Sequence, residues 1–326
     1  MNKTRYRISA FQLFFLVFAY VFSGLFLFAK GSLTATAISC LFAAALCVVA
    51  GCLCRGFSSS VDFYGAVFGR FSDIVRFLSL VFIAFGGVRA IYAFSLEICA
   101  YYKNANAAAV FFVCVFLAVF AVFRSFSGAS RFAELCVFAV AAIFLLCLLG
   151  RGGNVYFSFS AQEVLSSFDS FGSSAVIFSL YLRVITEDEA EMSDFARNAG
   201  AHPSPVLCGV FGALFAGLLY IFVCIRGGMS NILLLLFAWL LCMAGFFAGA
   251  VCVSDVLGIP ECEKGKALRR AMLFAIIGTA SVLLKGAVPE YLRAEASAFY
   301  NVIFPCVLFA VLYTRERKMS RADANK

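Results

Sequence analysis

Residues 163–185 read EVLSSFDSFGSSAVIFSLYLRVI. The apolar part, 175–185, would extend about 16 Å as a helix, which is about half of a ~30 Å hydrocarbon layer. The part before it is polar, so a helix at 163–169, an unwound stretch at Ser170–Ser174 and a second helix would together complete one crossing. Unpaired backbone inside a membrane is tolerated only where protein surrounds it or where it lines a cavity. The stretch therefore predicts a discontinuous membrane helix beside a cavity.

The composition of the whole chain fits this interpretation. Of the 326 residues, 63% are hydrophobic and 13% are charged, whereas soluble domains are about half apolar and about a quarter charged. A membrane-spanning helix needs about 20 apolar residues. Ten segments qualify: 8–29, 33–54, 76–100, 107–123, 131–150, 163–186, 205–226, 229–257, 268–285 and 295–313.

These ten segments predict one polytopic membrane domain over 1–326. A first five-helix half covers 1–150, a second covers 151–313, and a basic tail covers 314–326. Orientation follows the lysine and arginine bias of the loops. With a cytoplasmic N-terminus, 19 of the 26 lysines and arginines fall on the cytoplasmic side and six on the outer side. We therefore expect a multi-pass membrane protein with both termini in the cytoplasm.

The first segment carries a weaker interruption at Ser23–Gly24. An odd number of helices per half inverts the second half, so segments one and six occupy corresponding positions. Paired interruptions in an inverted repeat point to a binding site at the repeat interface. The alternative is that Gly24 only allows close packing of neighbouring helices. The favoured prediction is an all-α, 5+5 inverted repeat with discontinuous helices one and six.

Arg89 lies in the middle of the third segment, where burying an arginine costs roughly 2.5–3.5 kcal/mol on insertion scales. One interpretation is structural: the side chain bonds backbone carbonyls freed by a broken helix, or extends outward toward Glu97 and Asp169. The functional interpretation is that its planar guanidinium binds a ligand carboxylate. Glu97 and Asp169 are then a possible gate or ion pair. Asp255 ends the eighth segment, and we expect it to anchor the cytoplasmic rim.

Other classes of function find little support in the sequence. Most of the 14 cysteines lie in apolar runs, where cysteine behaves as a small hydrophobe. Neither a metal-ligand set nor a nucleophile–base arrangement stands out, so we expect no enzyme, no metal and no cofactor. The basic tail is explained by topology, which leaves no reason to invoke nucleic acid. Residues 57–75 are too polar to span and predict a short interfacial or re-entrant helix.

Three stretches carry a resemblance to a known family. They are ISAFQLFFLVFAYVFSG (8–24), SFSGASRFAELCVFAVAAIFLL (125–146) and SFSAQEVLSSFDSFGSS (158–174), followed by a terminal span with a basic tail. With ten spans and this length, the chain resembles the spore germination permeases, the integral-membrane B components of nutrient germinant receptors. That family belongs to the amino acid–polyamine–organocation superfamily. The chain departs from the family pattern at Ser23, Ala29 and Ser173–Ser174, as a divergent member would.

The resemblance implies a LeuT-like fold, a location in the cell or inner spore membrane, a small nutrient ligand such as an amino acid, and partnership with the receptor's A and C components. A sensor that binds the nutrient and signals germination is the first function it suggests. An ion-coupled amino-acid transporter is the alternative, and an assembly subunit without ligand binding is a third. We expect the substrate-binding residues to be Ser23, Gly24, Arg89, Ser173 and Ser174.

Overall fold

The structure of the chain is a computed structural model. It describes residues 8–54, 57, 60–102, 105–123, 125–149, 156–157, 159–170, 172–184, 204–227, 232–256, 295–296 and 298–311. Apart from two isolated bridges, the elements in these residues are helices. They are α1 (Ala10–Phe28), α2 (Leu33–Leu53), α3 (Ser60–Phe68), the 3-10 helix η1 (Gly69–Phe71), α4 (Ser72–Tyr101), α5 (Ala107–Phe123), α6 (Ser125–Leu135), α7 (Val137–Leu149), α8 (Ala161–Ser170), α9 (Ser174–Tyr181), α12 (Pro205–Phe222), the π-helical turn η2 (Val223–Gly227), α13 (Ile232–Val256) and the C-terminal helix (Ala298–Val311).

Six helical segments within the described residues are long and apolar enough to cross a membrane. They agree with the predicted segments at 8–29, 33–54, 76–100, 131–150, 205–226 and 229–257 to within a few residues, except that the third begins earlier. Helix α5 and the C-terminal helix also match predicted segments, at 107–123 and 295–313, but their apolar parts are shorter than a full crossing requires. For the described residues, the helical class and the presence of several helices long and apolar enough to span a membrane are thus confirmed. The predicted span at 268–285 lies outside the described residues.

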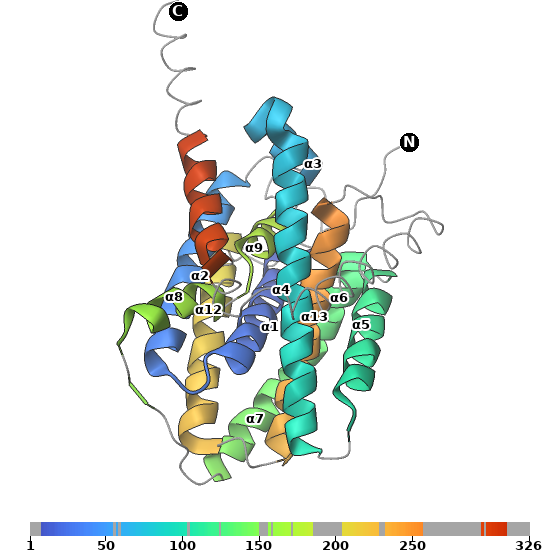
Figure 1. The fold of residues 1–326 in the computed structure, drawn as a ribbon, viewed down its shortest axis with the longest axis vertical. Helices are drawn as coiled ribbons and strands as arrows, with labels where there is room; N and C mark the ends of the chain where they lie inside the picture. The colour runs from blue at the N-terminus through green and yellow to red at the C-terminus, as the bar shows by residue number, and fades with distance from the viewer. Residues whose placement is uncertain are drawn as a thin grey trace, which may run out of the picture.

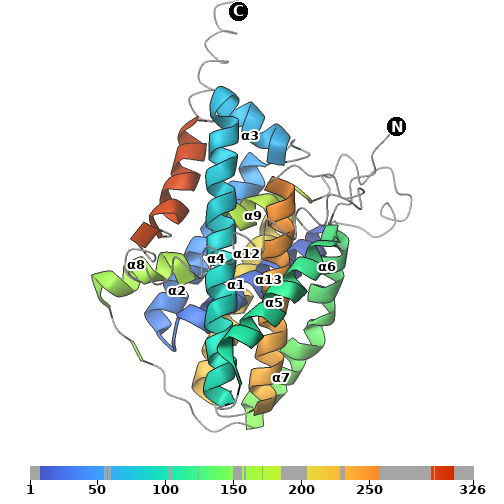
Figure 2. The ribbon, with the colours of Figure 1, turned by 45° about the vertical axis from the view of Figure 1, so that its right-hand side comes forward.

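Helix α1 forms the centre of the helix bundle. It packs most extensively against α12 and α13, and both ribbon views show it crossing the middle of the molecule behind the long helix α4 (Figures 1 and 2). Most of its side chains from Leu13 to Leu27 are buried. The start of α1 is fixed by a capping box, in which the Ser9 hydroxyl accepts from the Gln12 N–H and the Gln12 side chain accepts from the Ser9 N–H.

The predicted interruption of helix one is wrong, because α1 is one unbroken helix through Ser23 and Gly24. The Ser23 hydroxyl donates to the Tyr20 carbonyl within the helix at 2.7 Å, so it needs no unwound backbone. A side chain at Gly245 of α13 would collide with the Ser23 hydroxyl. Ser23 and Gly245 therefore lie in close contact between α1 and α13, as small residues at membrane helix interfaces do.

The predicted break in helix six is confirmed. Helix α8 ends at Ser170 and α9 begins at Ser174, and Gly172 between them has a φ of +105°. A φ in this region is open to glycine at little cost, whereas other residues rarely adopt it. The eight residues of α9 are all buried. Two short helices thus meet inside the protein, as the short apolar run predicts.

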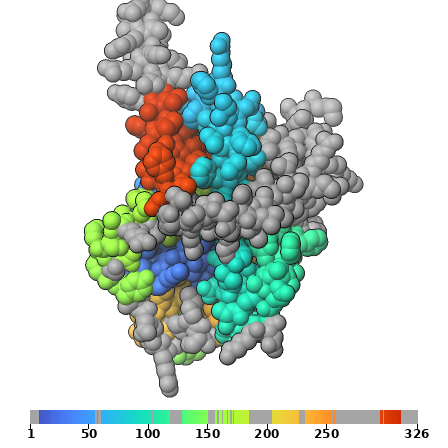
Figure 3. Space-filling view, viewed as in Figure 1, coloured from blue at the N-terminus to red at the C-terminus, as the bar shows by residue number. Residues whose placement is uncertain are grey.

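The short helix expected within 57–75 is also present, as α3. Its buried residues, Ser60, Phe63, Tyr64 and Val67, follow the i, i+3, i+4, i+7 spacing of one helix face. The space-filling view shows α3 and the start of α4 beside the C-terminal helix (Figure 3). This contact is specific, because the hydroxyls of Tyr64 on α3 and Tyr300 on the C-terminal helix both bond Ser79 of α4 at 3.1 Å.

Candidate functional site

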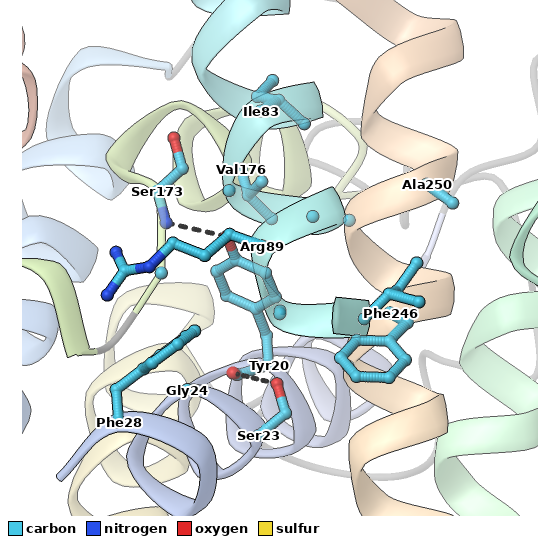
Figure 4. A pocket seen from close by; sticks show the side chains of 17 residues that line it. Tyr20, Ser23, Gly24, Phe28, Ile83, Arg89, Ser173, Val176, Phe246 and Ala250 are labelled. Atoms are coloured by element: carbon cyan, nitrogen blue, oxygen red, sulfur yellow. Dashed lines mark hydrogen bonds between the residues drawn. The ribbon is translucent and has the colours of Figure 1, made fainter. Parts of the chain in front are cut away.

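A cavity of about 40 Å³ lies where α1, α4, α13 and the break between α8 and α9 meet (Figure 4). Four of the five predicted binding residues line it: Ser23, Gly24, Arg89 and Ser173. They come from three parts of the chain that are far apart in sequence. The fifth, Ser174, is fully buried one residue farther along α9 and does not line the cavity.

The lining of this cavity is rich in hydrogen-bond donors. Among the described lining residues, the polar side chains are Tyr20, Ser23, Arg89 and Ser173, and the others are glycine or apolar. Six glycines contribute, so backbone forms much of the wall. The Ser23 hydroxyl donates within α1, and the other two hydroxyls and the guanidinium favour a ligand with a negatively charged, accepting group.

The break between α8 and α9 exposes backbone groups that two side chains satisfy. The Ser173 N–H donates to the Tyr20 hydroxyl at 2.7 Å. Asn301, fully buried on the C-terminal helix, accepts from the Ser174 N–H at 2.9 Å and donates to the carbonyls of Phe168 at 2.9 Å and Gly172 at 2.8 Å. Buried backbone groups without a partner are costly, so these two side chains hold the break in place without any ligand.

Two hydroxyls at the start of α9 remain without a hydrogen-bond partner among the described residues. They belong to Ser173 and Ser174, whose exposed fractions are 4% and 0%. Buried polar groups are normally bonded, and each exception in a folded protein calls for an explanation. Because Ser173 also lines the cavity, a ligand in the cavity is a direct explanation for its unused hydroxyl.

Arg89 lies near the middle of α4 and is half-buried. Its guanidinium carbon sits 4.2 Å from the centre of the Phe28 ring, a cation–π contact that holds the charge over an apolar face. Figure 4 shows the side chain extended across the pocket between Ser173 and Phe28. The guanidinium thus lies beside the start of α9, whose helix dipole adds positive charge at the same place.

Of the two acidic residues proposed as a gate or ion pair, the structure describes the side chain of Glu97 only. Glu97 is exposed, eight residues beyond Arg89 on α4, or about 12 Å along the helix. Asp169 lies in the last turn of α8, and its side chain is outside what the structure describes. Glu97 is not among the described residues that line the cavity.

Two residues at the site were missed by the sequence analysis. Tyr20 lies three residues before Ser23 and four before Gly24, so the helical repeat places all three on one face of α1. That spacing was available as a signal. Asn301 could have been found in a different way. It is an amide side chain inside the apolar terminal segment, and such a side chain must find hydrogen-bond partners within the protein.

Asp255, which we expected to anchor the cytoplasmic rim, is buried in the structure. Its exposed fraction is 2%, and it forms an ion pair with Arg183, whose exposed fraction is 8%. The Arg183 Nε donates to the Asp255 carboxylate at 2.7 Å, and the Ser60 hydroxyl donates to the other carboxylate oxygen. We call these three residues the Asp255 cluster. It joins α3, α13 and the end of α9, because a buried carboxylate needs both a counter-charge and donors.

The Asp255 cluster lies at the end of the bundle where α1 begins. The Ile8 N–H donates to the Arg183 carbonyl at 2.9 Å, which pairs the start of α1 with the end of α9. On α13, Asp255 is five residues beyond Ala250 of the cavity lining, or about 8 Å along the helix. The cluster and the cavity are therefore separate polar regions on the same helices.

The chain was also compared with known proteins. No protein-family model matches it, and no curated protein matches it. What the cavity does is therefore inferred from the residues that line it and from the helices that bring them together.

Proposed function

We propose that the chain is a transporter-like membrane subunit that binds a small nutrient with a carboxylate, such as an amino acid. In this proposal it is the B component of a spore nutrient germinant receptor and signals germination with A and C components. It has ten spans in a LeuT-like inverted repeat, with both termini in the cytoplasm. Binding at the cavity changes the packing of the helices around it, and the partner subunits respond to that change.

One observation supports the proposal above the others: a donor-rich cavity lies at a break in a membrane helix. A broken helix is exceptional in a membrane because its backbone must be satisfied inside the protein. Discontinuous helices with half-helix N-termini directed at anionic groups are a recurring feature of transporter binding sites. Arg89, Ser173 and the start of α9 supply such a site here.

The size of the cavity limits the ligand. A water molecule occupies roughly 10–15 Å³ by this measure, so about 40 Å³ holds about three water-sized groups. The smallest amino acids come closest to this size, and glycine is the natural probe. A larger ligand would need Arg89 or Phe28 to move outward first.

The sensor and the transporter predict different results in liposomes. Purified protein is reconstituted, and the binding and the uptake of labelled glycine are measured in the same preparation. The sensor binds glycine saturably with no more uptake than protein-free liposomes show. Concentrative uptake that depends on a proton or sodium gradient would replace the sensor by the ion-coupled transporter. Folded protein that binds none of a panel of small amino acids would contradict both.

One observation favours the transporter as the second candidate. Alternating access requires contacts that close one side of the site. The ion pair between Arg183 and Asp255 joins α9 to α13 beyond one end of the cavity. Such a contact would close one side of the site in a transporter, and the uptake measurement separates the two functions.

A further inference from the structure

The position of Tyr20 between the start of α9 and the cavity has a chemical consequence. Its hydroxyl oxygen accepts the Ser173 N–H at 2.7 Å, and the residue lines the cavity. A phenol oxygen that accepts one hydrogen bond keeps its own proton for donation. Accepting from an N–H also polarises the O–H and strengthens it as a donor.

The Tyr20 ring is held firmly in this place. A side-chain carbon added at Gly172 would lie only 2.6 Å from the Tyr20 hydroxyl, and the backbone there has a φ of +105°. The ring is thus packed directly against the backbone of the break. On α13, a carbon added at Gly249 would lie 3.7 Å from the ring, an ordinary contact distance, so this helix also packs close to the ring. The hydroxyl is positioned by packing before any ligand binds.

We propose that Tyr20 is the specificity-determining residue that selects ligands with a carboxylate. Its O–H donates to one carboxylate oxygen, the buried Ser173 hydroxyl donates beside it, and the Arg89 guanidinium faces the same group. The assignment rests on the proposed function of the cavity. It adds that a side chain of α1, bonded to the backbone at the start of α9, contacts the ligand.

This arrangement predicts which ligands are rejected. Replacing a carboxylate by a carboxamide removes the charge and places an NH₂ donor against a lining of donors. A site built for a particular hydrogen-bonding group rejects analogues that leave its polar groups unpaired. Glycinamide, which keeps the ammonium but not the carboxylate of glycine, is therefore the discriminating probe, and acetate is the reverse probe.

The chain supplies a matched control for a Tyr20 variant. Tyr220 on α12 is buried, whereas Tyr20 is partly buried, but the Tyr220 hydroxyl likewise accepts a backbone N–H, from Gly31 at 2.9 Å. It is not among the described residues that line the cavity. Tyr20→Phe and Tyr220→Phe thus remove the same kind of hydrogen bond, but only the first removes a group that faces the cavity.

The test is equilibrium binding of glycine, glycinamide and acetate to purified full-length protein, with thermal unfolding measured on each sample. We expect Tyr20→Phe to weaken the binding of glycine about 10- to 100-fold, the value of one charge-assisted hydrogen bond. We expect acetate binding to weaken similarly and glycinamide binding to stay weak and unchanged. Tyr220→Phe should bind all three probes as the wild type does.

Other results would overturn the assignment. Glycine binding by Tyr20→Phe at wild-type affinity would show that the hydroxyl does not touch the carboxylate. Equal loss for glycine and glycinamide would show a purely structural role. If Tyr20→Phe does not fold, Ser173→Ala is the second variant, because it keeps the backbone N–H and removes only the unused hydroxyl. Unchanged glycine affinity in Ser173→Ala would contradict the proposal that the two hydroxyls donate together to the carboxylate. Wild-type protein that binds no probe would instead overturn the proposed function itself.

Discussion

The cavity and the Asp255 cluster bury polar groups in opposite ways. In the cluster, a carboxylate, a guanidinium and a hydroxyl are bonded to one another across three elements. At the cavity, the backbone of the break is satisfied, but the Ser173 hydroxyl has no partner among the described residues. A buried donor without a partner is rare in folded proteins, and a functional role is one explanation for it. The difference separates a region that holds the fold together from one that we propose binds a ligand.

The largest expected effect comes from breaking the cluster. Asp255→Ala leaves the Arg183 charge buried without its counter-charge, and removing one partner of a buried pair costs about 3–5 kcal/mol. The control is Asp73→Ala, because Asp73 pairs with Arg76 but its side chain is 88% exposed, and exposed pairs contribute about 0–1 kcal/mol. Thermal unfolding in detergent measures both. Similar losses in the two variants would mean that the cluster is not a structural brace.

A smaller effect is expected from filling the contact between the break and Tyr20. Gly172→Ala strains the backbone at a φ of +105° and forces the new methyl group into the Tyr20 ring. Gly69→Ala is the control, because its φ is +55° and nothing lies within 4 Å of the added carbon. The difference between the variants isolates the collision, which should cost about 1–3 kcal/mol. Equal unfolding temperatures would show that the ring moves away freely.

The smallest effect compares two fully buried serines. The Ser39 hydroxyl of α2 donates to the Ser167 carbonyl of α8 at 2.6 Å, whereas the Ser174 hydroxyl has no partner among the described residues. Ser39→Ala should cost about 0.5–1.5 kcal/mol. Ser174→Ala should leave the free energy of unfolding unchanged or raise it slightly, since it removes an unsatisfied group. A loss in Ser174→Ala as large as in Ser39→Ala would reveal a hidden partner for that hydroxyl.

Much of the helix pattern could be predicted because membrane helices follow from local composition. Long apolar runs predicted α1, α2, α12 and α13, and a run too short to cross predicted the break before α9. Helix one shows the limit of the same reasoning. A serine and a glycine in an apolar run look the same in the sequence whether they unwind the helix or let a neighbouring helix pack closely. Only the structure, which places Gly245 of α13 against Ser23, distinguishes the two cases.

The site was predictable in part for the same reason. Ser23, Gly24, Arg89 and Ser173 could be proposed as neighbours because polar and small residues in apolar spans tend to face the protein interior. The bond between Tyr20 and Ser173 spans 153 residues, and the pair of Arg183 and Asp255 spans 72. Such pairings depend on how the helices pack, and a single sequence contains no direct signal of that packing.

The most direct test of the central claim measures ligand binding at Arg89. Labelled glycine is titrated against wild type, Arg89→Lys and Arg89→Ala at matched amounts of folded protein. If the cavity binds a carboxylate, Arg89→Ala should weaken binding about 10- to 100-fold. Arg89→Lys should recover only part of the affinity, because it keeps the charge but not the planar pair of donors. Saturable binding in the wild type with the same affinity in both variants would contradict the account.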